Sequence, residues 1–161
     1  MGIADKKKSV EEDIVDVDLG AIKKKRFRIN GDSNKIIELN TSDMNIVSRL
    51  NKIYPKLQDL AGEAVSLSKD EFNDNTEEGL KKFAERLEAI DSKMCDLIDE
   101  LFDAKVSAMC KDGGNMFDPF GGMLRFEHVI GALAKLYENN FNTEFGKMKQ
   151  RMSKHTSKYI K

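Results

Sequence analysis

The segment EEGLKKFAERLEAIDSKMCDLIDELFDAKVSAMC, residues 77–110, decides the fold of this chain. Its apolar residues recur at intervals of three and four, which places them along one face of an α-helix. They are Leu80, Phe83, Ala84, Leu87, Ile90, Met94, Leu97, Ile98, Leu101, Phe102, Val106 and Met109. The spacing predicts one continuous helix over residues 77–110, with Thr76 as its N-terminal cap.

A second helix is predicted ahead of this segment, over residues 44–61. Its apolar positions again recur every three or four residues, and Thr41 or Ser42 can cap its first turn. Pro55 lies inside the run and has no amide hydrogen to donate. We therefore expect a kink or a break near Tyr54.

A third helical pattern begins near Arg125. Its apolar residues keep the helical spacing as far as Phe141 and continue more weakly to Met152. Residues 66–76, by contrast, are polar, and they predict a linker between the first two helices.

The N-terminal part carries strand patterns instead. Residues 14–22 read IVDVDLGAI, in which apolar and acidic residues alternate as they do in a strand. KKRFRIN and KIIELN then flank GDSN, and Asn30-Gly31 supplies residues that tolerate a positive φ in a turn. This pattern predicts a β-hairpin over about residues 24–40, with room for a third short strand before it.

The predicted fold class is therefore α+β and mainly α. An N-terminal β-hairpin or small antiparallel sheet precedes a bundle of about three long helices. Residues 1–12 are charged and without periodicity, and we expect a disordered tail there. Residues 13–161 form one predicted domain, with the hairpin region at 13–40, the helical region at 41–161 and a basic C-terminal end from about residue 146.

Charge is balanced over the chain, with 27 basic and 28 acidic residues among 161 and a formal net charge of -1. A balanced protein has no overall field that attracts nucleic acid or an anionic membrane. The first residues lack the apolar core of a signal peptide, and no run reaches the length of a membrane span. With Cys95 and Cys110 expected as buried free thiols, we predict a soluble, cytoplasmic protein.

Patterns of catalytic residues are missing from the sequence. The two histidines are His128, at a predicted helix start, and His155, in the basic C-terminal end. No serine or cysteine motif accompanies them at a strand–helix turn, so no nucleophilic triad can be assembled. We therefore predict that the protein is not an enzyme.

Acidic and glycine residues near the third helix invite comparison with metal and phosphate sites. Counted as a calcium loop from Asp112, positions 3, 5 and 12 are Gly114, Met116 and Met123, where the motif requires oxygen ligands. The two Gly-Gly pairs lack the P-loop lysine and the dinucleotide-binding spacing, so we interpret them as helix stops and loop hinges. No metal site and no cofactor are predicted.

Basic residues gather in two patches, which phosphate groups could contact. The patches are Lys23, Lys24, Lys25, Arg26 and Arg28, and then Lys147, Lys149, Arg151, Lys154 and Lys158. The two arginines of the first patch alternate with Phe27 and Ile29, which is typical of the solvated face of a strand. A solvated helix end accounts for the second patch, so nucleic acid ranks below protein as a partner.

Three large apolar residues, Met116, Phe117 and Phe120, lie in a connection that should be polar. Because loops run over the surface, such side chains either fold back onto the core or face a partner. Folding back is the default, but methionine and aromatic residues are enriched at interface hot spots. These three are therefore our hypothetical partner-binding residues.

Three stretches of the chain resemble a known family. They are DVDLGAIKKKRFRING…KIIELNTSD within residues 16–43, MFDPFGG-x-x-R-F-E-H at residues 116–128, and KHTSKYIK at the C-terminal end. Over nearly its whole length, the chain resembles tail assembly chaperones from the tail gene clusters of long-tailed phages and prophages of Gram-positive bacteria.

This resemblance implies a non-enzymatic role in the cytoplasm of a bacterial host. Such chaperones bind the tape measure protein while tail tube subunits polymerise around it, and self-association is expected. Many copies on one extended partner hold together by avidity, even though each contact is weak. Two alternatives stay open: a small nucleic-acid-binding or regulatory protein that uses the basic patches, and a structural subunit of the tail.

Overall fold

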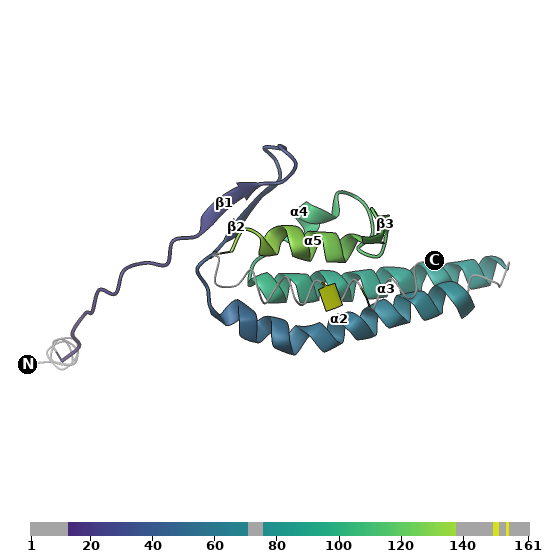
Figure 1. Cartoon of the computed structure of the whole chain (residues 1–161), viewed down its shortest axis with the longest axis horizontal. Helices are drawn as coiled ribbons and strands as arrows, with labels where there is room; N and C mark the ends of the chain where they lie inside the picture. Colours follow the sequence, from purple (N-terminus) through teal and green to yellow (C-terminus); the bar gives the residue numbers. More distant parts are fainter. Residues whose placement is uncertain (1–12, 71–75, 138–149, 152–153, 155–161) are drawn as a thin grey trace, which may run out of the picture.

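The computed structural model describes residues 13–70, 76–137, 150–151 and 154 (Figure 1). Two long helices, α2 (Asn45–Asp70) and α3 (Glu77–Phe102), lie side by side and run in opposite directions. The shorter α5 (Arg125–Ala134) lies on the side of α3 that faces away from α2, and α4 (Ser107–Lys111) lies next to it. The predicted α+β, mainly helical class is confirmed.

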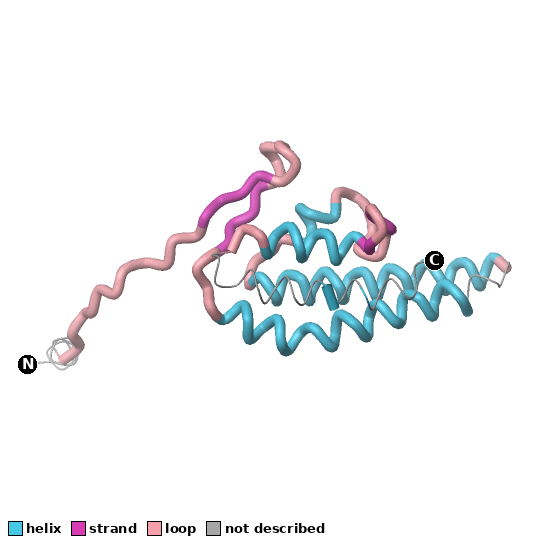
Figure 2. The backbone as a smooth tube through the Cα atoms, viewed as in Figure 1, coloured by secondary structure: helices cyan, strands magenta, loops and turns pink. Residues whose placement is uncertain are grey.

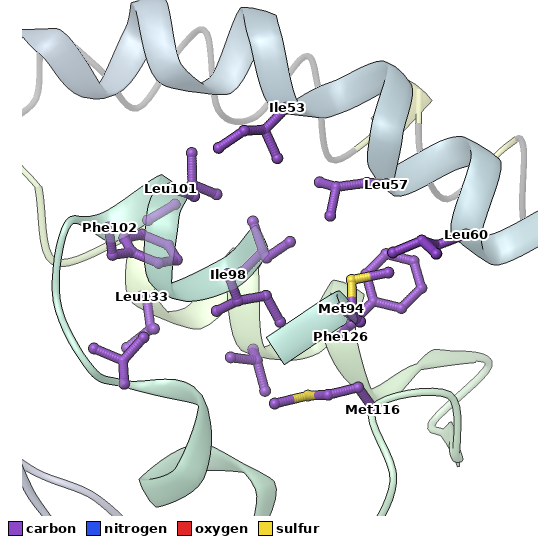
Figure 3. Close-up of a cluster of buried hydrophobic side chains, with 14 of the residues drawn as sticks. Ile53, Leu57, Leu60, Met94, Ile98, Leu101, Phe102, Met116, Phe126 and Leu133 are labelled. Carbon is purple, nitrogen blue, oxygen red and sulfur yellow. The ribbon is translucent and has the colours of Figure 1, made fainter. Parts of the chain in front are cut away.

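One apolar core joins the three layers of helices. Figure 3 shows side chains of α2, α3 and α5 meeting in a single cluster, with Met116 entering from the loop after α4. The labelled members are Ile53, Leu57, Leu60, Met94, Ile98, Leu101, Phe102, Met116, Phe126 and Leu133. Because α3 is the middle layer, its apolar stripe contacts both neighbours, which explains why that segment dominates the sequence pattern.

The helix predicted over residues 77–110 is interrupted, which is a correction. α3 ends at Phe102, and Asp103 adopts a left-handed conformation with φ of 49°. Asp99 then accepts hydrogen bonds at Oδ1 from the backbone amides of Val106 and Ser107, at 2.9 and 2.8 Å. A carboxylate that binds the first amides of a helix favours a new start there, so the chain turns and α4 begins.

Three predictions about α2 also need correction. Of the kink or break predicted near Tyr54, the break is wrong, because Pro55 lies inside an unbroken helix. The helix continues to Asp70 and takes in half of the predicted polar linker, because Leu67 is buried in the core. The first amide of the helix, that of Asn45, donates to Asp43 Oδ1 at 2.9 Å, so the capping carboxylate is Asp43 and not a residue at 41 or 42.

Four residues assigned to the apolar stripes lie outside the core. Met44, Leu80, Ala84 and Leu136 are exposed. Cys95 and Cys110 are free, as predicted, but they are half-buried instead of buried.

The predicted β-hairpin is confirmed. β1 (Lys25–Arg28) and β2 (Ile36–Leu39) pair antiparallel, with Phe27 opposite Ile37. Asn30 and Gly31 both have positive φ, at 54° and 70°, as their turn chemistry predicts. Ile37 and Leu39 bury the inner face of the hairpin against the helices.

The third strand expected before the hairpin is not formed among the described residues. Residues 14–22 are extended but pair with no strand in the described part of the chain, and Figure 2 shows them as a loop that leads away from the body. The strand that the alternation of apolar and acidic residues predicts is therefore wrong for the described chain, and Gly20, with φ of 78°, interrupts a regular strand geometry.

Other predictions fall outside the described residues. They concern the disordered tail at 1–12, most of the third helix beyond Tyr137, the basic residues Lys147, Lys149 and Lys158, and His155. The start of the third helix at Arg125 is confirmed, but α5 ends at Ala134 and residues 135–137 form a turn, so the predicted continuation of this helix through Tyr137 is wrong.

Candidate protein-binding groove

A buried carboxylate fixes the loop that follows α4. Asp91, on α3, accepts a hydrogen bond at Oδ1 from the backbone amide of Met116, at 2.7 Å, and its Oδ2 pairs with the Lys111 ammonium. The carbonyl of Met116 in turn accepts the amide of Phe126 at 2.8 Å. Both backbone groups of Met116 are therefore satisfied inside the protein, and the loop is tied to α3 and α5 together.

The Met116 side chain does not lie on the surface. Its side chain is 0% exposed and points into the helical core, where Figure 3 shows it near Phe126. Phe117 is half-buried and packs edge-on against Phe126, with ring centroids 5.7 Å apart. At these two residues the loop folds back onto the helical core, because burying their side chains removes a large apolar surface from water.

Phe120 differs, since 42% of its surface is exposed. It lies in a small hairpin formed by β3 (Pro119–Phe120) and β4 (Met123–Leu124), whose turn is the glycine pair 121–122. Both glycines have positive φ, at 56° and 83°, as a two-residue turn of this kind requires. The pair is a hairpin turn, which corrects its interpretation as a hinge.

Two polar side chains of α5 hold the ring of Phe120. His128 stacks on it with centroids 4.3 Å apart, and the Arg125 guanidinium lies 5.8 Å from its centroid. Arg125 also faces Asp118 at 3.8 Å. An aromatic ring that is held by two neighbouring side chains and is still exposed loses little conformational freedom when a partner covers it.

An open groove runs from Phe120 to the first β-hairpin, and we call it the hairpin–α5 groove. Its volume is about 380 Å³, within the range of roughly 300–1,000 Å³ that binding pockets occupy. Its lining is mostly apolar, with an arginine on each wall. The residues are Phe27, Arg28, Ile29, Asn30, Cys110, Asp112, Phe120, Arg125, His128, Val129, Ala132, Leu133 and Leu136.

One ion pair connects the two walls of this groove. Lys35, in the loop of the first hairpin, donates a hydrogen bond to Asp112 at the end of α4. That bond raises the pKa of Lys35 and lowers the pKa of Asp112. Because Asp112 is neutralised in this way, Arg28 and Arg125 give the groove its positive character.

Sequence patterns missed most of the groove, although one signal was present. Arg125, Val129, Ala132, Leu133 and Leu136 are spaced so that they share one face of the α5 helix and its following turn. Phe126, Ile130 and Ala134 lie on the adjoining face and are buried, as are Val129 and Leu133. An apolar stripe this wide, with the exposed Ala132 and Leu136 at its edge, has more apolar surface than one core contact requires.

Among the described residues of the two predicted basic patches, Arg28 alone lines the groove. Lys23, Lys24 and Lys25 are exposed on and before β1, and Arg26 faces Glu38 across the strands at 3.7 Å. Of the second patch, Arg151 lies 5.7 Å from the ring centroid of Tyr54, and Lys154 is exposed.

The oxygens tested against a calcium loop serve the local fold. Asp118 Oδ2 accepts the amide of Asn115 at 2.9 Å, and Asn115 Oδ1 accepts that of Phe117 at 2.8 Å. Within the described ranges, no cluster of three or more histidine, cysteine or acidic side chains is arranged to hold a metal ion.

Comparisons with known proteins give the chain no family. No family model, no curated protein and no solved structure matches it. Among the helices that the structure describes, none combines the length and the apolar character needed to cross a membrane.

Proposed function

We propose that this protein is a non-enzymatic protein-binding module whose hairpin–α5 groove holds an extended, apolar segment of a partner. The observation that supports the proposal is the exposed ring of Phe120 at one end of the groove, held by His128 and Arg125. Exposed aromatic rings in preformed apolar depressions are characteristic of interface hot spots.

The groove is suited to an extended segment because it is open and mostly apolar, with charged side chains in its lining. Val129 and Leu133 line it from α5, and Ile29 lines it from the first hairpin. Alternate side chains of an extended chain point to opposite sides, so every second residue can enter the groove. Arg28 and Arg125 remain available to bind polar groups of the same segment.

We further propose that the partner is a phage tape measure protein and that the protein acts as a tail assembly chaperone in the bacterial cytoplasm. The family resemblance supports this identification, and the groove supplies a physical means for it. A contact of this size is weak on its own, so many copies on one long partner are needed to keep that partner in solution.

Co-expression with the tape measure protein of the same gene cluster tests the proposal. We expect the two proteins to elute together and the tape measure to stay in solution. Phe120→Asp should abolish co-elution, because it places a charge where an apolar side chain must bind. Leu80→Asp is the matched control, since Leu80 is also exposed but lies far along α3 from the groove. A tape measure that is equally soluble alone, or equal loss with both variants, contradicts the proposal.

A second function is favoured by the exposure of Lys23, Lys24 and Lys25, which could contact phosphates. It predicts nucleic-acid binding that weakens steeply as salt concentration rises, and loss of that binding when the three lysines are changed to glutamate. Such binding, together with a tape measure that fails to co-elute, would replace the chaperone proposal.

A further inference from the structure

The segment of residues 14–22, which we call the arm, exposes a series of large apolar side chains. Ile14, Val15, Val17, Leu19 and Ile22 are between 66% and 90% exposed. The arm is extended and, within the described part of the chain, joins no sheet. So much apolar surface in one short segment is unfavourable in water and marks a contact site.

The two sides of the arm differ in chemistry. Because successive residues of an extended chain point to opposite sides, alternation puts Val15, Val17 and Leu19 on one side, and Asp16 and Asp18, together with Ile14, on the other. The arm therefore presents an apolar side and an acidic side along the same backbone.

The hairpin–α5 groove has the complementary chemistry. Its base is apolar, and Arg28 and Arg125 lie on its walls. The one carboxylate in its lining, Asp112, is paired with Lys35. Arg125 keeps terminal guanidinium donors for a further acceptor, since its distance of 3.8 Å to Asp118 exceeds a hydrogen bond.

We propose that the arm of one copy of this chain docks in the hairpin–α5 groove of a second copy. Val15, Val17 and Leu19 enter the groove, while Asp16 and Asp18 face Arg28 and Arg125. The two carboxylates of the arm favour this groove over a neutral apolar surface. A surface without arginines leaves them without a counter-charge, and an acidic surface repels them.

Docking within one chain is opposed by the direction of the arm. The arm enters β1 at Lys25, which pairs with Leu39, whereas the groove begins at the opposite end of β1, at Phe27 and Arg28. Figure 1 shows the arm leading away from the helices. The groove of a second copy can accept the arm without the arm folding back along its own hairpin. Reciprocal docking closes a dimer, and one-way docking builds a longer chain.

This inference uses the groove of the proposed function and names a second occupant for it. The arm is then a built-in occupant that a longer apolar partner displaces. A groove that is covered in this way in the free protein does not expose its apolar base to water.

Sedimentation of the full chain tests the proposal with two variants that impair different sides of one contact. The arm variant is Asp16→Lys with Asp18→Lys, and the groove variant is Arg28→Glu with Leu136→Asp. The measured mass of the wild-type particle should rise with protein concentration, from the 18.2 kDa of one chain to at least twice that mass. Each variant alone should stay at 18.2 kDa. An equimolar mixture of the two should regain the larger mass, because the arm variant retains a groove and the groove variant retains an arm.

The matched control is Asp59→Lys with Asp96→Lys, which makes the same charge change at exposed sites on α2 and α3 and should associate like wild type. Circular dichroism checks that each variant is folded, and Arg28→Glu alone replaces the groove variant if the double substitution unfolds. A wild type that stays at 18.2 kDa, an arm variant that associates like wild type, or a mixture that stays monomeric would each overturn the proposal.

The two proposals fail separately in these experiments. The arm variant retains an intact groove, so it should still co-elute with the tape measure protein. If it does so while wild type is monomeric, only the arm proposal is lost. If wild type associates through the arm but captures no tape measure, only the chaperone proposal is lost.

Discussion

Asp91 Oδ1 and the backbone nitrogen of Met116 lie 2.7 Å apart, although 25 residues separate them in sequence. This one hydrogen bond joins the middle of α3 to the loop that carries Phe120. The same carboxylate binds Lys111, so it also holds the end of α4. The wall of the groove is thus positioned by a buried acidic residue that does not itself line the groove.

Asp91→Ala should therefore destabilise the protein by about 2–4 kcal/mol, because it leaves the Met116 amide and the Lys111 ammonium without their acceptor. Chemical denaturation measures the loss. Asp91→Asn should cost less, since an amide oxygen can still accept from Met116. Asp96→Ala, an exposed site on the same helix, is the control and should change the unfolding free energy by less than about 0.5 kcal/mol. Equal effects of Asp91→Ala and Asp96→Ala would contradict this role.

The three apolar residues of the loop should separate into two classes on substitution. Met116→Ala removes a fully buried side chain and should cost about 2–5 kcal/mol. Phe120→Ala should change the melting temperature little, because much of its ring already contacts water, yet it should abolish capture of the tape measure. Thermal melting and co-elution, measured on both variants, give the comparison. A large stability loss for Phe120→Ala would show that its ring belongs to the core.

Alanine at two glycines should have opposite effects on stability. Gly122 has φ of +83°, so Gly122→Ala should cost about 1–2 kcal/mol through backbone strain, although no atom lies within 4 Å of the new Cβ. Gly62 lies inside α2 with equally open space around it, and Gly62→Ala should stabilise the protein by up to about 1 kcal/mol. Denaturation of both variants checks the sign, and stabilisation by Gly122→Ala would be inconsistent with the β3–β4 turn.

The thiol of Cys110 should react slowly at neutral pH. Burial raises its pKa to about 11, so the reactive thiolate is roughly a hundredfold scarcer than in an ordinary cysteine with a pKa of 9.0. Labelling with a thiol reagent in a Cys95→Ala background measures this site alone. The folded-state pKa is raised, so the associated stability is present below about pH 9 and is lost as the pH rises towards 11. Rapid labelling at pH 7 would contradict the burial of this thiol.

Periodicity predicted the parts of the fold that depend on local apolar spacing. The hairpin, the core stripes of α2 and α3, and the start of α5 at Arg125 all follow from it. The interruption at Asp103 does not, because apolar spacing continues across it through Val106 and Met109. α3 ends at the left-handed Asp103, and the Asp99 carboxylate then caps the start of α4; periodicity reports neither feature.

The candidate site was only partly predictable for a related reason. Phe120 stood out as a large aromatic residue in a loop, but Met116 looked equivalent to it in sequence. The burial of Met116 depends on its hydrogen bond with Asp91. The two residues are 25 positions apart in sequence, so the contact leaves no local pattern. The opposite wall of the groove comes from the first hairpin. The ion pair of Lys35 and Asp112 holds it in place, and these two residues are 77 positions apart in sequence.

The most direct test of the groove as a protein-binding site is hydrogen exchange of the full chain, measured alone and in its complex with the tape measure protein. We predict that backbone amides of residues 27–30 and 120–136 become protected in the complex, while exchange in α2 stays unchanged. A complex in which these residues exchange as in the free protein, with protection elsewhere on the surface, would contradict the central claim.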